Sequence, residues 1–142
     1  MTDIPRSVIY LKMGKMISVH GGGVAVKSYV HIRDVSRGEL AAMREARAGT
    51  IYHLSPEKGY AVGDVVGTIC DLLGYEFKAC TVTVGERLGQ DAAYVIDSTR
   101  ARQELGWIPK VSLQDGLAEV VGWVEDNWEQ INRESLEYVH KS

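Results

Sequence analysis

Three basic side chains stand at positions that the sequence predicts to be extended or in loops, where a cation can reach an anionic ligand. They are Lys27, Arg33 and Arg87. Arg87 belongs to the polar segment 86–91, between a predicted strand and a predicted helix. An arginine in such a loop suits bidentate hydrogen bonding to a phosphate. Composition alone favours a solvated loop arginine, so a phosphate site at these residues needs further support.

The segment 21–28, Gly-Gly-Gly-Val-Ala-Val-Lys-Ser, is close in pattern to a phosphate-binding P-loop. The glycine that must precede the lysine is Val26 here, and valine resists the backbone conformation that lets amides wrap a phosphate. No strong apolar strand leads into the segment and no helix leaves it. The favoured interpretation is therefore a glycine-rich hairpin turn.

The residue patterns of dinucleotide chemistry are missing from the sequence. No GxGxxG or GxxGxxG lies between a predicted strand and a predicted helix, so the usual cradle for a pyrophosphate is absent. No tyrosine is followed four positions later by a lysine, and no serine–histidine or cysteine–histidine signature stands out. We therefore predict no catalytic residue in this chain.

Metal and disulfide sites are not predicted either. The histidines have no metal-ligand spacing and no CxxC occurs. The two cysteines, Cys70 and Cys80, are too few for a disulfide framework in a domain of this size. Cys70 falls on the apolar side of a predicted helix, where we expect a small buried thiol.

The composition is that of a globular domain. The chain has 142 residues, 45% of them apolar and 25% charged, with a net charge of −3. Interleaved charges do not resemble the basic footprint of a nucleic-acid binder, although a local basic cluster can still bind a small anion. Short apolar runs predict no membrane span, and the first residues lack the apolar region of a signal peptide. We expect a cytoplasmic protein with neither nucleic-acid nor membrane partners.

The elements that position these residues alternate between strand and helix, which predicts an α/β fold. Helical periodicity and capping residues predict helices over residues 5–13, 34–47, 62–73, 98–105 and 112–131. Asp34 is the expected N-cap of the second helix, and Ser112 with Asp115 resembles a capping box. Extended segments are predicted over residues 17–20, 24–32, 50–54 and 81–84.

A series of short motifs, in a fixed order over about residues 4–130, resembles one family. The motifs are Ile4-Pro5-Arg6, Gly14-Lys15, Val19-His20-Gly21-x-Gly23, Lys27-Ser28-Tyr29-Val30-His31-Ile32-Arg33-Asp34-Val35, Gly49-Thr50-Ile51-Tyr52-His53-Leu54, Arg87-x-Gly89-x-Asp91, Tyr94-Val95-Ile96-Asp97, Glu104-Leu105-Gly106-Trp107-x-Pro109 and Ser112-Leu113-x-x-Gly116-Leu117. Their order and spacing resemble the nucleotide-sugar epimerases and dehydratases among the extended short-chain dehydrogenases, particularly the dTDP-glucose 4,6-dehydratase branch.

The resemblance implies the carboxyl-terminal part of an extended Rossmann-type enzyme. Residues 1–142 would form a single substrate-binding domain that includes the last strand of the Rossmann sheet, at residues 51–54. The glycine-rich amino-terminal half, which binds NAD and carries the Tyr-x-x-x-Lys pair in that family, would be absent. We therefore expect a fragment that binds no NAD alone.

The resemblance also implies a function. The parent enzyme would be a lyase or isomerase of carbohydrate biosynthesis that acts on a nucleotide-diphosphate sugar by transient oxidation at C4 of the hexose. This chain would bind the substrate and be inactive alone. An alternative is a freestanding, non-catalytic binding or interaction module, with self-association through an unpaired sheet edge; a third is a reductase of the same family. Homodimerisation stays open.

Five residues match substrate-binding positions of the family. His20 matches a residue beside the nucleotide base, and Lys27 matches a diphosphate-binding position usually held by arginine. Arg87 matches the arginine of an Arg-Pro-Gly-x-Asp motif that contacts the diphosphate, and Asp91 would order that loop. His53 stands where the family usually has asparagine. Lysine at position 27 keeps the positive charge but loses the bidentate fork of arginine.

Overall fold

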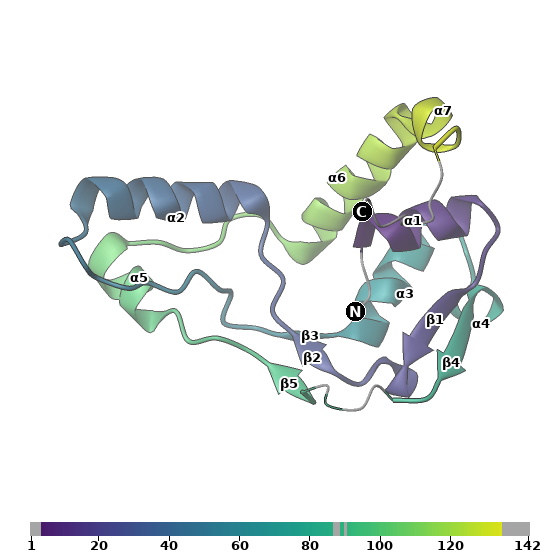
Figure 1. Cartoon of the computed structure of the whole chain (residues 1–142), viewed down its shortest axis with the longest axis horizontal. Helices are drawn as coiled ribbons and strands as arrows, with labels where there is room; N and C mark the ends of the chain where they lie inside the picture. The colour runs from purple at the N-terminus through teal and green to yellow at the C-terminus, as the bar shows by residue number, and fades with distance from the viewer. Residues whose placement is uncertain (1–3, 87–88, 90, 135–142) are drawn as a thin grey trace, which may run out of the picture.

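The computed structural model describes residues 4–86, 89 and 91–134 of the chain. Short helices and strands alternate along it (Figure 1). In chain order they are α1 (Ile4–Lys12), β1 (Ile17–His20), the 3-10 turn η1 (Gly21–Gly23), β2 (Val26–Lys27), α2 (Ile32–Glu45), β3 (Tyr60–Ala61), α3 (Val62–Leu73), α4 (Phe77–Cys80), β4 (Thr81–Val84), β5 (Ala93–Tyr94), α5 (Thr99–Leu105), α6 (Leu113–Asp126) and α7 (Trp128–Ile131).

The strands form two small sheets. Strands β1 and β4 pair in parallel, from Ile17 opposite Thr81 to His20 opposite Val84. The second sheet has the order β3-β2-β5, in which β2 runs antiparallel to β3 and parallel to β5. Parallel pairs need a crossover connection, so each joins segments that lie far apart in the sequence. The fold is α/β, as the sequence predicts.

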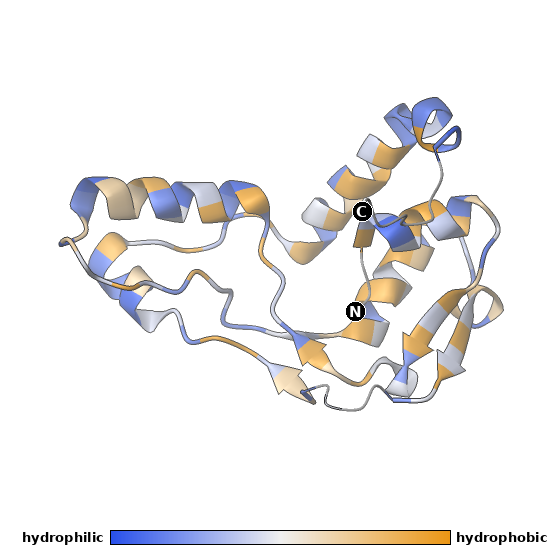
Figure 2. Cartoon of the chain, viewed as in Figure 1, coloured by the Kyte–Doolittle hydropathy of each residue, from blue (hydrophilic) through white to orange (hydrophobic). Residues whose placement is uncertain are grey.

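The larger hydrophobic core lies among α1, α3, α6 and the β1–β4 sheet. Apolar residues recur at helical spacing along α3, and Figure 2 shows the apolar character of these helices. The buried members are Val8, Leu11, Ile17, Val19, Val65, Val66, Ile69, Cys70, Leu117, Val121 and Val124. The helical periodicity predicted over residues 112–131 is confirmed in α6, whose Leu117, Val121 and Val124 are buried, and so is the predicted buried thiol of Cys70.

A smaller core lies between α2 and α5, in the part of the molecule drawn on the left of Figure 1. Its buried residues are Ala101, Leu105 and Trp107. Helix α2 approaches this core closely at Gly38, where a Cβ atom would lie 2.6 Å from Leu54 Cδ1. A side chain at this position would have to displace its neighbours, so glycine permits the helix to pack here.

Local signals predicted several helices and their ends correctly. Helix α1 is followed by Gly14, whose φ of 69° is left-handed, and α3 and α5 end in the same way at Gly74 and Gly106. Ser112 caps α6 by accepting a hydrogen bond from Asp115 N, which confirms the predicted cap. Strands β1 and β4 also have the predicted bounds.

Two predicted extended segments differ in the structure. Residues 50–54 form no strand, because an extended segment needs a paired neighbour and no other described segment pairs with it. Residues 24–32 form a strand only at Val26 and Lys27, which pair with β3 and β5. The side-chain alternation indicated an extended backbone but not how much of it finds a hydrogen-bonded partner.

The prediction of Asp34 as an N-cap is wrong. Helix α2 begins two residues earlier, at Ile32, and His31 is the N-cap, with its Nδ1 accepting a hydrogen bond from Arg33 N at 3.2 Å. The helix also ends at Glu45, before the predicted end at residue 47. Asp34 is instead a buried residue of the first helical turn.

Asp34 connects α2 to the segment that precedes α6. Its Oδ2 accepts hydrogen bonds from Lys110 N and Val111 N, each at 3.0 Å, and its other oxygen pairs with Arg37. Trp107 Nε1 donates to the Asp34 carbonyl oxygen at 2.7 Å. Burial raises the pKa of Asp34, but the hydrogen bonds and the charge of Arg37 lower it further, so the net pKa lies below its ordinary 3.8.

We expect Asp34→Asn to lower the free energy of unfolding by about 2–4 kcal/mol at pH 7, because a buried, hydrogen-bonded charge is lost. The folded pKa is depressed, so the stabilisation is present above the unfolded pKa and is lost as the pH falls through the folded value. The difference between wild type and variant should therefore shrink from pH 5 downward. Urea unfolding across this pH range measures it.

Glu39→Gln is the matched control, because it removes an exposed carboxylate from the same helix. We expect this control to change stability by no more than about 0.5 kcal/mol. A gap between wild type and Asp34→Asn that stays constant from pH 7 to pH 3 would show that the Asp34 carboxylate is not the stabilising group.

The turn η1 contains a close approach between two backbones. Gly23 has a φ of 76°, and a Cβ atom there would lie 2.7 Å from Gly63 N at the start of α3. Gly22 has a φ of 68°, but a Cβ atom there would meet nothing within 4 Å. Both glycines adopt the left-handed backbone conformation, but only at Gly23 would a side chain also collide with a neighbouring segment.

Alanine at the two positions separates these effects. We expect Gly22→Ala to cost about 1–2 kcal/mol of stability, the cost of left-handed backbone for an L-residue. Gly23→Ala should cost a further 1–3 kcal/mol or so, because its methyl group also collides with backbone. Equal losses in urea unfolding would contradict the close approach.

Candidate functional site

The candidate site lies where the carboxyl ends of the two parallel strands β1 and β4 meet. Because His20 is opposite Val84, the chain leaves both strands at the same edge, into η1 on one side and Gly85 on the other. In α/β proteins, ligands bind outside the carboxyl ends of parallel strands, and the segments that follow these strands supply the contacts.

His20 connects the segment that follows β1 to the segment that follows β4. Its Nδ1 lies 3.1 Å from Gly85 O, so the protonated ring nitrogen can donate to that carbonyl. A Cβ atom on Gly21 would lie 3.4 Å from Glu86 Cγ, so the turn also packs against the residue that follows Gly85. The structure thus places His20 at the strand edge, with Nδ1 occupied by the backbone.

Lys27 is held from the side of β5. Its Nζ donates to the backbone oxygen of Asp91 at 3.3 Å and lies 5.7 Å from the ring centroid of Tyr94. The β2–β5 register explains this position, because it places Lys27 directly opposite Tyr94. The ammonium makes no ion pair with any carboxylate in the described part of the chain, so its charge is available to an anion.

The structure therefore brings two of the predicted binding residues together, Lys27 and Asp91. The contact uses the Asp91 backbone, while the Asp91 carboxylate is exposed. Arg87 lies outside the described residues. The neighbouring residue Glu86 packs against η1, and Asp91, on the other side of Arg87 in the sequence, contacts Lys27.

Two other predicted residues lie elsewhere. His53 is exposed and lies near Asp97, which precedes α5. The hydrogen bonds from Thr99 lower the pKa of Asp97 most, followed by the charge of Arg102 and then by His53. Arg33, one of the three basic candidates, pairs with Glu119 of α6. No described interaction connects either residue to Lys27. Of the three basic residues that the sequence suggested as an anion-binding cluster, only Lys27 lies at the candidate site among the described residues.

The Gly21–Gly23 segment is a turn but not a hairpin. Hairpin strands pair with each other, whereas β1 pairs with β4 and β2 pairs with β3 and β5. The segment also leads into β2 rather than into a helix, which agrees with the prediction that it is no P-loop. Its left-handed glycines turn the chain from one sheet to the other.

Sequence reasoning missed Tyr94 as a site residue. This tyrosine belongs to one of the family-like motifs, but no local pattern places it beside a lysine that lies 67 positions earlier, as the numbers 94 and 27 give. Only the β2–β5 register reveals the pair. A cation near an aromatic ring is attracted by the electron-rich face, and this helps to hold the Lys27 side chain in place.

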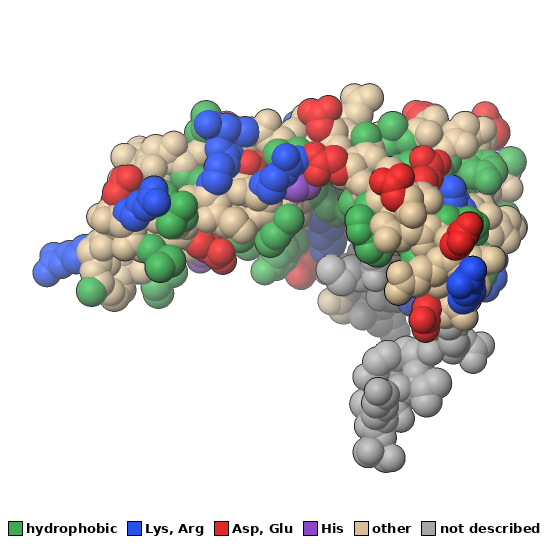
Figure 3. All heavy atoms as spheres, turned by 90° about the horizontal axis from the view of Figure 1, so that it is seen from above, with side chains coloured by type: hydrophobic (Ala, Val, Ile, Leu, Met, Phe, Trp, Pro, Cys, Tyr) green, Lys and Arg blue, Asp and Glu red, His purple; other side chains and the backbone are tan. Residues whose placement is uncertain are grey.

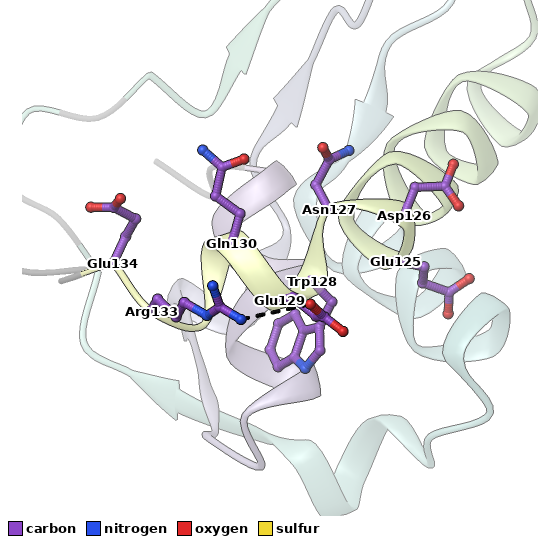
Figure 4. Close-up of a pocket in the computed structure, with 8 residues that line it drawn as sticks. All are labelled: Glu125, Asp126, Asn127, Trp128, Glu129, Gln130, Arg133 and Glu134. Carbon is purple, nitrogen blue, oxygen red and sulfur yellow. Dashed lines mark ion pairs between the residues drawn. The ribbon is translucent and has the colours of Figure 1, made fainter.

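A surface pocket lies elsewhere, at the end of α6 and around α7 (Figure 4). Its lining residues are Glu125, Asp126, Asn127, Trp128, Glu129, Gln130, Arg133 and Glu134. Carboxylates dominate it, and Arg133 pairs with Glu129. This charge is the wrong sign for a phosphate, so the pocket does not replace the strand-edge site.

Surface charge is mixed elsewhere. On the face that Figure 3 shows, basic, acidic and apolar side chains are interspersed, without a continuous basic surface. Among residues 4–86, 89 and 91–134, no group of three or more histidine, cysteine or acidic side chains could hold a metal ion. The same described residues contain no helix with the length and apolar character that crossing a bilayer requires.

Known relatives align with nearly all of this chain, but the alignment covers less than half of each relative's own length. The dTDP-glucose 4,6-dehydratase of Streptomyces griseus is 33% identical over 131 residues, which cover 90% of this chain and 40% of that protein. The dTDP-glucose 4,6-dehydratase of Escherichia coli is 29% identical over 133 residues, which cover 88% and 37%. No family model matches the chain.

Solved structures give the same result. The dTDP-glucose 4,6-dehydratase of Streptomyces venezuelae, solved with NAD and TYD bound, matches with a TM-score of 0.82 at 33% identity, covering 89% of this chain and 39% of that one. The UDP-glucose 4-epimerase of Thermotoga maritima, solved with UDP-glucose, matches with a TM-score of 0.80 at 27% identity, covering 88% and 40%.

The chain spans about 40% of the length of the relatives that it matches. The agreement extends from the sequence to the arrangement of helices and strands. In sequence and in fold, the chain is therefore similar to the carboxyl-terminal portion of the dTDP-glucose 4,6-dehydratases, which are extended short-chain dehydrogenases.

Proposed function

We propose that this chain is the substrate-binding domain of an NAD-dependent enzyme that acts on a nucleotide-diphosphate sugar. The whole enzyme would be an epimerase or 4,6-dehydratase that works through transient oxidation at C4 of the hexose. This chain would bind the diphosphate and position the sugar, without moving a proton or a hydride itself. The two similar structures that were solved with TYD and with UDP-glucose support this class of ligand.

The observation that carries the proposal is the environment of Lys27. Its ammonium is held by one backbone oxygen and an aromatic ring and has no described carboxylate partner. An ammonium has three donors, so donors remain for phosphate oxygens. The position beside the carboxyl edge of parallel strands is where α/β proteins bind nucleotides. Arg87, which follows β4 by three residues, would add the second cation.

The described residues do not fit NAD. The three consecutive glycines of this chain lead from β1 into β2, so no helix N-terminus follows them to receive a pyrophosphate. No Tyr-x-x-x-Lys pair occurs in the sequence. We therefore assign the cofactor to the portion of the relatives that this chain does not match, and we give this chain a role in binding and orientation.

Orientation is a sufficient role for a separate domain. A diphosphate held by cations on two segments cannot rotate freely, so the attached sugar is presented in one direction to the reacting groups. Holding a reactant in a productive geometry contributes several kcal/mol to catalysis even when the holding residues do no chemistry.

The second candidate function is a freestanding, non-catalytic interaction module. The observation that favours it is the β1–β4 sheet, in which the two strands pair only with each other in the described chain. Strand edges that are left unpaired can associate with another chain. An in-frame glycine-rich loop and Tyr-x-x-x-Lys pair upstream in the coding sequence would favour the enzyme, and their absence would favour the module.

We expect Lys27→Ala to raise the Kd of the chain for dTDP-glucose by about 10–100-fold, the equivalent of 1.5–3 kcal/mol for a charge-assisted hydrogen bond. Lys27→Arg should retain most of the affinity, because it keeps the charge and offers a bidentate donor. Calorimetric titration of each variant measures the effect, and a thermal melt of each confirms that it is folded.

Lys15→Ala is the matched control. Lys15 also lies over a tyrosine ring, 5.4 Å from the centroid of Tyr10, but in the loop between α1 and β1. Its replacement should leave the Kd unchanged. Arg87→Ala is expected to act in the same direction as Lys27→Ala. If Lys27→Ala and Lys15→Ala bind with the same Kd, the assignment of Lys27 to the diphosphate is wrong.

A further inference from the structure

The only two cysteines of the chain lie side by side. Cys70 is on α3 and Cys80 is the last residue of α4, ten positions apart in the sequence, and their Sγ atoms are 3.2 Å from each other. A disulfide has a sulfur–sulfur distance of about 2.05 Å, so the pair needs to close by roughly 1.1 Å. This is within the reach of small side-chain rotations.

The two thiols differ in access. Cys70 is fully buried in the larger core, between helices that the core residues hold in place, whereas Cys80 is only partly buried. Burial, followed by the hydrogen bond with Cys80, raises the pKa of Cys70 to about 12. Cys70 therefore stays a neutral thiol that solvent does not reach, and a reagent from solution meets Cys80 first.

The backbone around the pair favours their proximity. Helix α3 ends at Gly74 in the left-handed conformation, and Tyr75 N donates to Cys70 O at 2.9 Å. The chain then turns into α4, and Cys80 is followed directly by Thr81, the first residue of β4. Figure 1 shows α4 beside the start of β4. The sulfur pair is therefore part of a tight connection between the core helix α3 and the strand β4.

We propose that Cys70 and Cys80 form a reversible dithiol site that a small-molecule disulfide oxidises to an intramolecular disulfide, which ties α3 to the start of β4. No third cysteine competes for either sulfur. This inference concerns oxidation of the chain itself and does not depend on the proposed ligand.

The reaction runs through thiol–disulfide exchange. The Cys80 thiolate attacks one sulfur of oxidised glutathione, forms a mixed disulfide and releases one glutathione thiolate. The neutral Cys70 thiol then attacks Cys80 Sγ, and its proton passes to the second glutathione thiolate as that group leaves. Two protein thiols are thereby oxidised to one disulfide, one glutathione disulfide is reduced, and two protons end on the released glutathione.

Incubation of the native protein with excess oxidised glutathione tests the proposal. We expect the intact mass to fall by two hydrogens, with no thiol left for alkylation and no covalent dimer on a non-reducing gel. Reduced glutathione in excess should restore both thiols. The oxidised form should melt on the order of 5–10 °C higher, because the cross-link restricts the unfolded chain.

Two single variants identify the order of attack. Cys70→Ala should stop at a stable mixed disulfide between Cys80 and glutathione, visible as an added glutathione mass. Cys80→Ala should remain unmodified while folded, because Cys70 is buried. The proposal is wrong if the folded protein keeps its mass under oxidised glutathione while the protein unfolded in urea forms the disulfide. It is also wrong if the oxidised form melts at a lower temperature than the reduced form.

Discussion

Parallel pairing of β1 with β4 is the interaction on which the candidate site depends. It places His20 opposite Val84 although the two residues are 64 positions apart, as their numbers give. The β2–β5 pairing does the same for Lys27 and Tyr94. Neither pair of strands is long, so the helices must hold them. Helices α1, α3 and α6 bury the apolar face of β1 in the larger core and keep the strand ends in register.

The buried carboxylate of Asp34 provides the second constraint. By accepting hydrogen bonds from the backbone at residues 110 and 111, it fixes α2 to the segment that precedes α6. Helix α6 packs in the larger core, whereas α2 covers the smaller one. Since the carboxylate is buried, a small movement of α2 would break its hydrogen bonds to Lys110 N and Val111 N and leave a buried charge with fewer donors, and this cost couples the two cores.

Features with local causes could be predicted from the sequence. Gly14, Gly74 and Gly106 end helices because the left-handed conformation they adopt costs glycine little, and Ser112 caps α6 through the next turn of the same helix. Asp34 was misassigned because the same residue type caps helices and also accepts buried hydrogen bonds. The backbone donors that its carboxylate accepts from, Lys110 N and Val111 N, are more than seventy positions away. The segment 50–54 failed as a strand for the same reason, since pairing is not a local property.

The candidate site, too, has residues that the sequence could predict and contacts that it could not. The resemblance of motifs identified Lys27 and Asp91, and the structure joins them, but no periodicity could have predicted that Tyr94 lies beside Lys27 or that Arg33 pairs with Glu119. Motif order carries information about ancestry and hence about distant contacts. Local patterns carry information about backbone conformation. His53 shows the limit of both, because a matching position in a motif does not by itself bring a side chain to the site.

The central claim is that this chain binds the sugar nucleotide without binding the dinucleotide cofactor. Calorimetric titration of the chain with dTDP-glucose and UDP-glucose, with NAD as a parallel ligand, tests it most directly. We predict saturable binding of at least one sugar nucleotide at one site per chain, and no heat of binding with NAD. Binding of NAD, or silence toward both sugar nucleotides from a folded chain, would contradict the claim.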